Sequence, residues 1–111
     1  KVMRACIWLD AQGRLPAFAR AAFEIYWGQD QDISQDAVIG ELCRRTGDDA
    51  DALFAAIARP EVKQRLRANT DELVARGGFG SPTMYVGDDM YFGNDRLVLV
   101  REAVRRVQAA R

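Results

Sequence analysis

Residues 77–96 read GGFGSPTMYVGDDMYFGNDR, and this stretch decides the fold. Two β-rich segments, residues 83–86 and 90–92, flank Gly87-Asp88-Asp89, which is a turn signal typical of a β-hairpin. Asn94-Asp95 comes next and contains the kind of short polar side chain that begins helices. The stretch therefore predicts strand, strand and helix, with unpaired backbone N–H groups beside two polar side chains.

Toward the N-terminus, residues 1–76 are predicted to be helical throughout. Apolar residues recur every three or four positions, interrupted at Gln12-Gly13. Pro16 suits the first turn of the second helix, and Pro60 suits the start of the last helix before the hairpin. The expected apolar positions are Ala5, Leu9, Leu15, Phe18, Ala22, Ile25 and Tyr26 in the first helices, then Val62, Leu66, Leu73 and Val74.

Capping residues predict the remaining helix boundaries. Ser34 is expected to be the N-cap of a helix over residues 35–46, which Gly47 ends in a left-handed conformation. Either Asp49 or Asp51 can cap the short helix that follows. The pattern is a helical array followed by a β-β-α unit, whose two strands alone are marginal and leave an edge and an apolar face exposed.

Composition excludes several classes of protein. The chain has 111 residues, enough for one domain at most, and its 16 basic and 16 acidic residues cancel. Without a net positive field, binding to nucleic acid or to an anionic membrane is not expected. No apolar run approaches the length that spans a bilayer.

Histidine is absent, which excludes a Ser-His-Asp or Cys-His nucleophile within this chain and removes the commonest zinc ligand. No metal site is predicted. Cys6 and Cys43 do not form a Cys-x-x-Cys pair, so the chain carries no dithiol redox motif. Two buried thiols are preferred over a disulfide or a reactive cysteine, and free thiols suit a reducing cytoplasm.

The Gly-Phe-Gly-Ser-Pro-Thr turn and the later Phe-Gly-Asn-Asp-Arg resemble the C-terminal half of 2-hydroxychromene-2-carboxylate isomerases. These enzymes are grouped with kappa-class glutathione transferases in the DsbA-like branch of the thioredoxin fold. The resemblance implies an α/β, DsbA-like (kappa-type) thioredoxin fold, with residues 1–76 as its helical insert and residues 77–111 as its C-terminal β-β-α half. It also implies that the N-terminal β-α-β unit lies upstream of Lys1, outside this chain.

The resemblance implies a glutathione site made of Ser81, Pro82, Asn94 and Asp95. Ser81-Pro82 matches the family's cis-proline turn, whose backbone pairs with the cysteinyl part of glutathione; an ordinary trans proline at a strand start is the alternative. Asn94 and Asp95 match the pair that meets the γ-glutamyl end, with Asp95 binding its ammonium. The alternative for Asp95 is a helix N-cap alone.

No catalytic residue is assigned, because the family's catalytic serine would lie upstream of Lys1. Arg96 is expected to brace the helix start or a neighbouring carboxylate. Phe79 and Phe92 are expected to be packing residues. Tyr26 and Trp27 are also expected to pack in the core, with a place in the aromatic substrate's pocket as the alternative.

The preferred function is the glutathione-dependent isomerisation of 2-hydroxychromene-2-carboxylate to trans-o-hydroxybenzylidenepyruvate, in aromatic hydrocarbon catabolism. The resemblance further implies a cytoplasmic homodimer, and this segment alone is expected to be inactive. A kappa-like glutathione transferase is a close alternative. A protein disulfide oxidoreductase with its active site upstream of this chain is a second class, and a non-catalytic helical interaction module is a third.

Overall fold

A computed structural model describes residues 1–110 of the chain. The chain divides into two compact units, Lys1–Asn69 and the residues from Thr70 onward. The boundary falls inside one continuous helix, α5 (Pro60–Ala75). The assignment of residues 1–76 as an insert stays a prediction.

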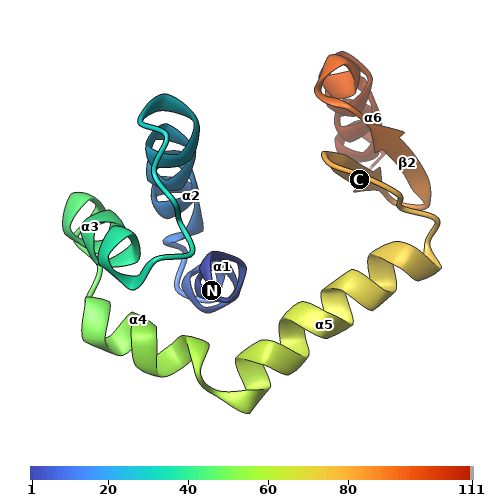
Figure 1. Cartoon of the computed structure of the whole chain (residues 1–111). Helices are drawn as coiled ribbons and strands as arrows, with labels where there is room; N and C mark the ends of the chain where they lie inside the picture. Colours follow the sequence, from blue (N-terminus) through green and yellow to red (C-terminus); the bar gives the residue numbers. More distant parts are fainter. Residues whose placement is uncertain (111) are drawn as a thin grey trace. The chain divides into compact units, whose positions relative to one another are not determined.

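The first unit is helical. It contains α1 (Val2–Asp10), α2 (Leu15–Phe23), the π-helical turn η1 (Glu24–Gly28), α3 (Asp36–Thr46), α4 (Ala50–Ile57) and the first part of α5 (Figure 1). Helix α1 contacts α2 and α4, and α3 also contacts both of those helices. The predicted periodicity is confirmed for Ala5, Leu9, Phe18, Ala22 and Ile25, which are all buried in one core. Tyr26 was expected there too, but it is exposed.

Two of the predicted caps are confirmed and one is wrong. Gly47 ends α3 with a φ of 75°, and Asp49 caps α4 by accepting the Ala52 N–H at 3.1 Å. Ser34 does not cap α3, which begins at Asp36. Instead, Ser34 donates its N–H and its hydroxyl to the Asp32 carboxylate, at 2.9 and 2.6 Å. Both hydrogen bonds lower the pKa of Asp32, and the bond from the Ser34 hydroxyl has the larger effect.

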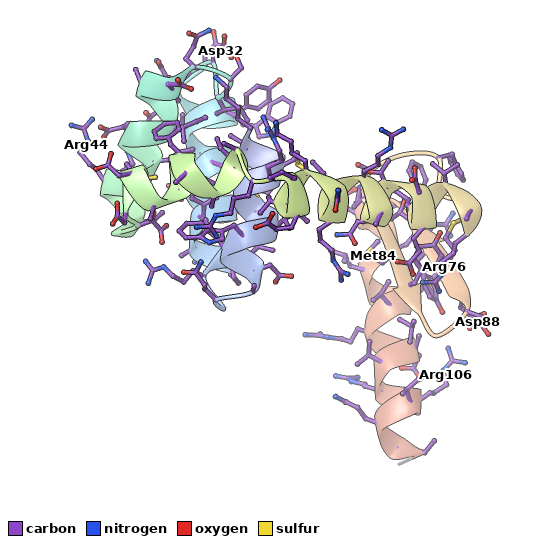
Figure 2. All side chains as sticks on the ribbon, turned by 90° about the horizontal axis from the view of Figure 1, so that it is seen from below. Asp32, Arg44, Arg76, Met84, Asp88 and Arg106 are labelled. Atoms are coloured by element: carbon purple, nitrogen blue, oxygen red, sulfur yellow. The ribbon has the colours of Figure 1, made fainter. Side chains whose placement is uncertain are left out.

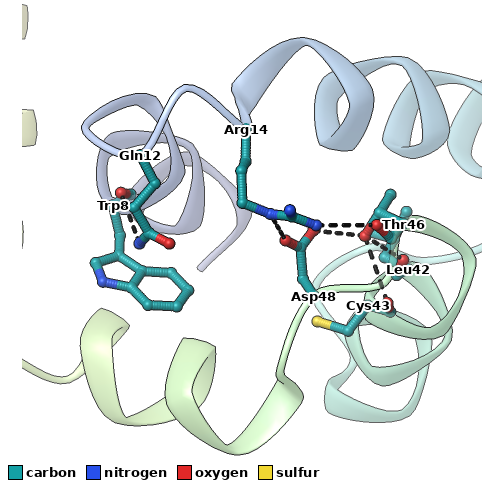
Figure 3. A network of polar contacts seen from close by, with 7 residues as sticks. All are labelled: Trp8, Gln12, Arg14, Leu42, Cys43, Thr46 and Asp48. Atoms are coloured by element: carbon teal, nitrogen blue, oxygen red, sulfur yellow. Dashed lines mark hydrogen bonds and ion pairs between the residues drawn. The ribbon is translucent and has the colours of Figure 1, made fainter.

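A polar network joins the start of α2 to the loop after α3 (Figure 3). The Arg14 Nε donates to the Asp48 carboxylate at 2.5 Å, and the Arg14 guanidinium also reaches the Thr46 carbonyl at 3.1 Å. The Thr46 hydroxyl donates to the second Asp48 oxygen at 2.5 Å. The Asp48 side chain is only 3% exposed, whereas that of Arg14 is 46% exposed, so a buried carboxylate is held by a partly solvated cation.

The second unit begins with the last turns of α5. Gly77, with a φ of 89°, ends that helix: its N–H bonds to the Val74 carbonyl, and the Gly78 N–H bonds to the Leu73 carbonyl. These two bonds define a Schellman motif. The predicted hairpin is confirmed as β1 (Thr83–Val86) and β2 (Asp89–Phe92), which pair antiparallel with Thr83 opposite Phe92 and Val86 opposite Asp89. A short 3-10 turn, η2 (Asn94–Arg96), then leads into α6 (Leu97–Ala109).

Arg76 braces the hairpin. Its guanidinium donates to the Gly87 carbonyl at 2.7 Å and lies 3.8 Å from the centre of the Tyr85 ring. The Tyr85 hydroxyl in turn donates to the Arg76 carbonyl at 3.2 Å. Figure 2 shows Arg76 near the turn that carries Asp88. The end of α5 is therefore tied to the hairpin by both the guanidinium and the backbone carbonyl of Arg76.

The second unit leaves much apolar surface uncovered, as the sequence predicted for a two-stranded sheet. The Val98 side chain on α6 is 77% exposed, and that of Phe79 is 73% exposed. Phe79 was expected to be a packing residue. The centre of its ring does lie 4.7 Å from the centre of the Phe92 ring, but other residues do not enclose the pair. No helix within residues 1–110 is both long enough and apolar enough to cross a membrane.

Candidate functional site

The hairpin brings the two halves of the predicted site to one end of the sheet. Thr83 and Phe92 form the last residue pair of the ladder, and one step beyond them the Gly93 N–H donates to the Pro82 carbonyl at 2.9 Å. Ser81-Pro82 and Asn94-Asp95 flank this bond. All four predicted site residues are therefore held at the same open end of the hairpin.

The Ser81–Pro82 peptide bond is cis, as the sequence predicted. Ser81 and Pro82 are both exposed, and the Thr83 hydroxyl holds the turn by donating to the Gly80 carbonyl at 2.5 Å. Within the described part of the chain, no hydrogen bond is made to the backbone of Ser81. An exposed, unpaired peptide group beside a strand can accept the backbone of an extended ligand.

Asn94 and Asp95 lie in η2, directly before α6, and both are exposed. The alternative that Asp95 is a helix N-cap is wrong, because no side chain caps either η2 or α6. The Asp95 carboxylate instead turns back over Gly93, where an added Cβ would lie 2.6 Å from its Oδ1 atom. Among residues 1–110 the Asp95 carboxylate has no cation partner, so it is free to bind one from a ligand.

Arg96 does not do what the sequence suggested. It was expected to brace the helix start or a neighbouring carboxylate, yet no ion pair or side-chain hydrogen bond engages it within residues 1–110. Its side chain instead borders a hollow of about 410 Å³, together with residues Met90, Tyr91, Phe92 and Leu99. Within the described part of the chain, Arg96 is thus a cation without an ion-pair partner beside the candidate site.

Tyr26 and Trp27 were expected to pack in the core, but both are exposed. Trp27 is 75% exposed rather than buried, and its ring meets that of Tyr26 edge-on with the ring centres 4.7 Å apart. Both residues lie in η1, and π-helical turns are frequent at functional sites. The polar run that follows, Gln29 to Asp32, was the sequence signal that this helix ends at the surface.

Both cysteines are free, as predicted, but only Cys43 is buried as expected, whereas Cys6 is partly exposed. Burial raises the pKa of each thiol, and nearby carboxylates add to the effect: Asp10 at Cys6, and Asp48 and Asp49 at Cys43. Both thiols are therefore protonated at neutral pH and are poor nucleophiles. Within residues 1–110, no three acidic or cysteine side chains gather into a group that could hold a metal ion.

The sequence matches the DSBA-like thioredoxin domain over residues 1–105. The chain therefore belongs to the DsbA-like thioredoxin family, in a mostly helical form with a small two-stranded sheet. The names of individual related proteins are more specific than the family model. A 2-hydroxychromene-2-carboxylate isomerase from Sphingobium xenophagum is 32% identical over 93 residues, which make up 84% of this chain and 48% of that protein. The enzyme of the same name from Pseudomonas putida is 27% identical over 97 residues, covering 87% of this chain and 48% of that protein.

Glutathione S-transferase kappa 1 from Homo sapiens is 31% identical over 81 residues, covering 67% of this chain and 36% of that protein. A solved structure of a 2-hydroxychromene-2-carboxylate isomerase superposes with a TM-score of 0.80 at 26% identity, covering 98% of this chain and 55% of the other. The predicted family and fold are confirmed. The chain spans about half the length of the curated isomerases it matches.

Proposed function

We propose that this chain forms the glutathione-holding part of an isomerase that acts on 2-hydroxychromene-2-carboxylate. The main support is the Gly93 to Pro82 hydrogen bond of 2.9 Å, which keeps Ser81 and Asp95 at one end of the hairpin. Relatives named as this isomerase, at 27–32% identity, support the reaction, and relatives named as kappa glutathione transferases support the cofactor.

The residues present fit glutathione chemically. The unpaired Asp95 carboxylate suits the ammonium of a γ-glutamyl group, since a charge-assisted hydrogen bond is among the stronger polar contacts. The Asn94 amide can donate to the carboxylate of the same γ-glutamyl group, and the unpaired Ser81 backbone suits the peptide-like part of glutathione. These groups would bind and orient one end of the cofactor.

Bound glutathione would supply a thiolate nucleophile, which is returned unchanged at the end of an isomerisation. In this chain Ser81, Asn94 and Asp95 hold and position, and none of them is assigned a proton transfer. Location in the cytoplasm, assembly as a homodimer and a role in aromatic catabolism accompany the proposal as predictions from the family resemblance. So does the inactivity of this segment alone.

Calorimetric titration of glutathione into the protein at its full natural length tests the proposal. Binding between micromolar and millimolar is expected (about −8 to −4 kcal/mol). Asp95→Ala should weaken it at least about tenfold, which is the low end for a hydrogen bond to a charged group. Asp88→Ala, in the exposed hairpin turn, serves as the matched control and should leave the affinity unchanged.

The alternatives separate in the same experiment. Glutathione binding without isomerisation of the chromene acid would favour a kappa-like glutathione transferase. A well-folded protein that binds no glutathione would sink the proposal, and a disulfide oxidoreductase with its active site upstream of this chain would then lead.

A further inference from the structure

The loop before the hairpin is held by a single hydrogen bond. Residues 79–81, which we call the site loop, lie outside any helix or strand and end at Ser81 of the candidate site. The half-buried side chain of Thr83, the first residue of β1, donates its hydroxyl to the Gly80 carbonyl at 2.5 Å. Among residues 1–110 no other hydrogen bond reaches the site loop, so its position depends strongly on this one.

The same face of the hairpin also supports the site loop by packing. Thr83 lies directly opposite Phe92 in the ladder, so the two side chains project from one face. A Cβ added at Gly80 would lie 2.8 Å from the Phe92 Cε2 atom, which shows how closely the loop backbone approaches that ring. The ring centre of Phe79 lies 4.7 Å from that of Phe92. The Thr83 hydroxyl therefore fixes a loop that already rests on an aromatic side chain.

The chemistry of both partners makes this bond a control point. Thr83 is β-branched and belongs to a paired strand, so its hydroxyl has few positions available. The site loop contains Gly80 and follows Gly77-Gly78, and glycine loses more backbone freedom on ordering than any other residue. Without the hydroxyl, the backbone of Ser81, one residue after Gly80, would sample positions that do not suit a ligand.

We propose that Thr83 is a positioning residue, which holds the site loop in the arrangement that binds glutathione and so sets the affinity. The inference rests on the proposed function. Thr83 acts through Gly80 and Ser81, and no contact between Thr83 and the ligand is required. When only part of the molecules hold a binding-competent loop, the apparent affinity falls by that fraction. A neutral hydrogen bond is strong enough to change such a population about fivefold.

Calorimetric titration of glutathione into variants of the protein at its full natural length tests the role of the hydroxyl. Thr83→Val keeps the size and branching of the side chain but removes the donor, and should weaken binding about fivefold. Thr83→Ser restores the donor and should bind within about twofold of the parent protein.

Tyr85→Phe is the matched control. It removes another hydroxyl from the same strand, one that donates to the Arg76 carbonyl at 3.2 Å and does not touch the site loop. If loss of a hairpin hydrogen bond were enough to weaken binding, this variant would behave like Thr83→Val. We expect instead an affinity within about twofold of the parent protein.

A second readout needs no ligand. In free Thr83→Val, the backbone amide order parameters of residues 79–81 should fall below those of the parent protein, toward the flexible range under about 0.6. Those of Thr83→Ser and Tyr85→Phe should not change. The positioning role is overturned if the loop order parameters of Thr83→Val match those of the parent protein, if Thr83→Ser does not restore the affinity, or if Tyr85→Phe weakens binding equally. A parent protein that binds no glutathione would overturn the proposed function, and the order parameters would still decide whether Thr83 fixes the loop.

Discussion

Replacing Gly93 with alanine should damage the candidate glutathione site through two separate effects. Gly93 has a φ of 98° and a ψ of 146°, in a region that side chains other than glycine rarely adopt, so alanine costs about 1–3 kcal/mol of stability. The new Cβ would also lie 2.6 Å from the Asp95 Oδ1 atom, which is too close for a real contact. The Asp95 carboxylate must therefore swing away from its present position.

The second effect sets the expected loss of binding. A hydrogen bond from an ammonium to a carboxylate contributes about 1.5–3 kcal/mol, so its loss weakens binding about 10- to 150-fold. Calorimetry with glutathione measures the affinity, and thermal unfolding measures the loss of stability. Gly93→Ala is expected to lower both.

Gly87→Ala is the matched control. Gly87 also has a positive φ, 61°, but an added Cβ there meets nothing within 4 Å. The substitution should cost about 1–2 kcal/mol of stability and leave the glutathione affinity within twofold of the parent protein. The reasoning is refuted if Gly93→Ala binds glutathione normally, or if Gly87→Ala weakens binding to the same extent.

Three further outcomes follow from the contacts described. Asp48→Ala should lower the free energy of unfolding by about 2 kcal/mol in urea titrations, because it removes two hydrogen bonds to a buried carboxylate. Arg44→Gln, which breaks an exposed ion pair, is the control and should lower it by less than about 0.5 kcal/mol. Equal losses in the two variants would contradict the role given to Asp48. Arg76→Met should cost about 1–2 kcal/mol and speed amide exchange in the hairpin, since the bond to the Gly87 carbonyl is lost; unchanged exchange would speak against the brace. The pKa of Cys43 is raised above its ordinary value of 9.0 by burial first and by nearby carboxylates second, so its contribution to stability is complete below pH 9 and falls as the pH rises beyond it. The difference in stability between the parent protein and Cys43→Ala should therefore narrow above pH 9, and a constant difference would contradict the shift.

The hairpin was predictable because its information is local. Residues 83–92 contain both strands and the turn between them, and antiparallel pairing across a tight turn then brings Ser81-Pro82 to Asn94-Asp95 without any distant contact. The pairing of Arg14 with Asp48 joins residues 34 positions apart and gave no signal in the sequence. The α3 boundary was missed because Asp32 and Ser34 both carry capping groups, and Asp32 accepts the hydrogen bonds of Ser34.

The exposed aromatic residues show a different limit. An apolar side chain predicts burial only when another surface is available to cover it, and pattern alone cannot count such surfaces. Phe79 and Trp27 were expected to pack, yet both are largely exposed. Arg96 was missed for another reason: a charged side chain predicts a partner of opposite charge without showing which one, and no ion pair engages Arg96 among residues 1–110.

The hydrogen bond between the Gly93 N–H and the Pro82 carbonyl has a consequence for local motion. It joins the two strands at the end of the hairpin opposite the turn, between the two halves of the candidate site. If the ladder frays from this end, the groups that would bind a ligand move apart. A ligand bound to both Ser81-Pro82 and Asn94-Asp95 must therefore dissociate before the two strands can separate. At a hundred times its dissociation constant, such a ligand would protect the ladder amides by about 2.7 kcal/mol. Occupancy of the site could then be followed by hydrogen exchange of the ladder amides, without any measurement of catalysis.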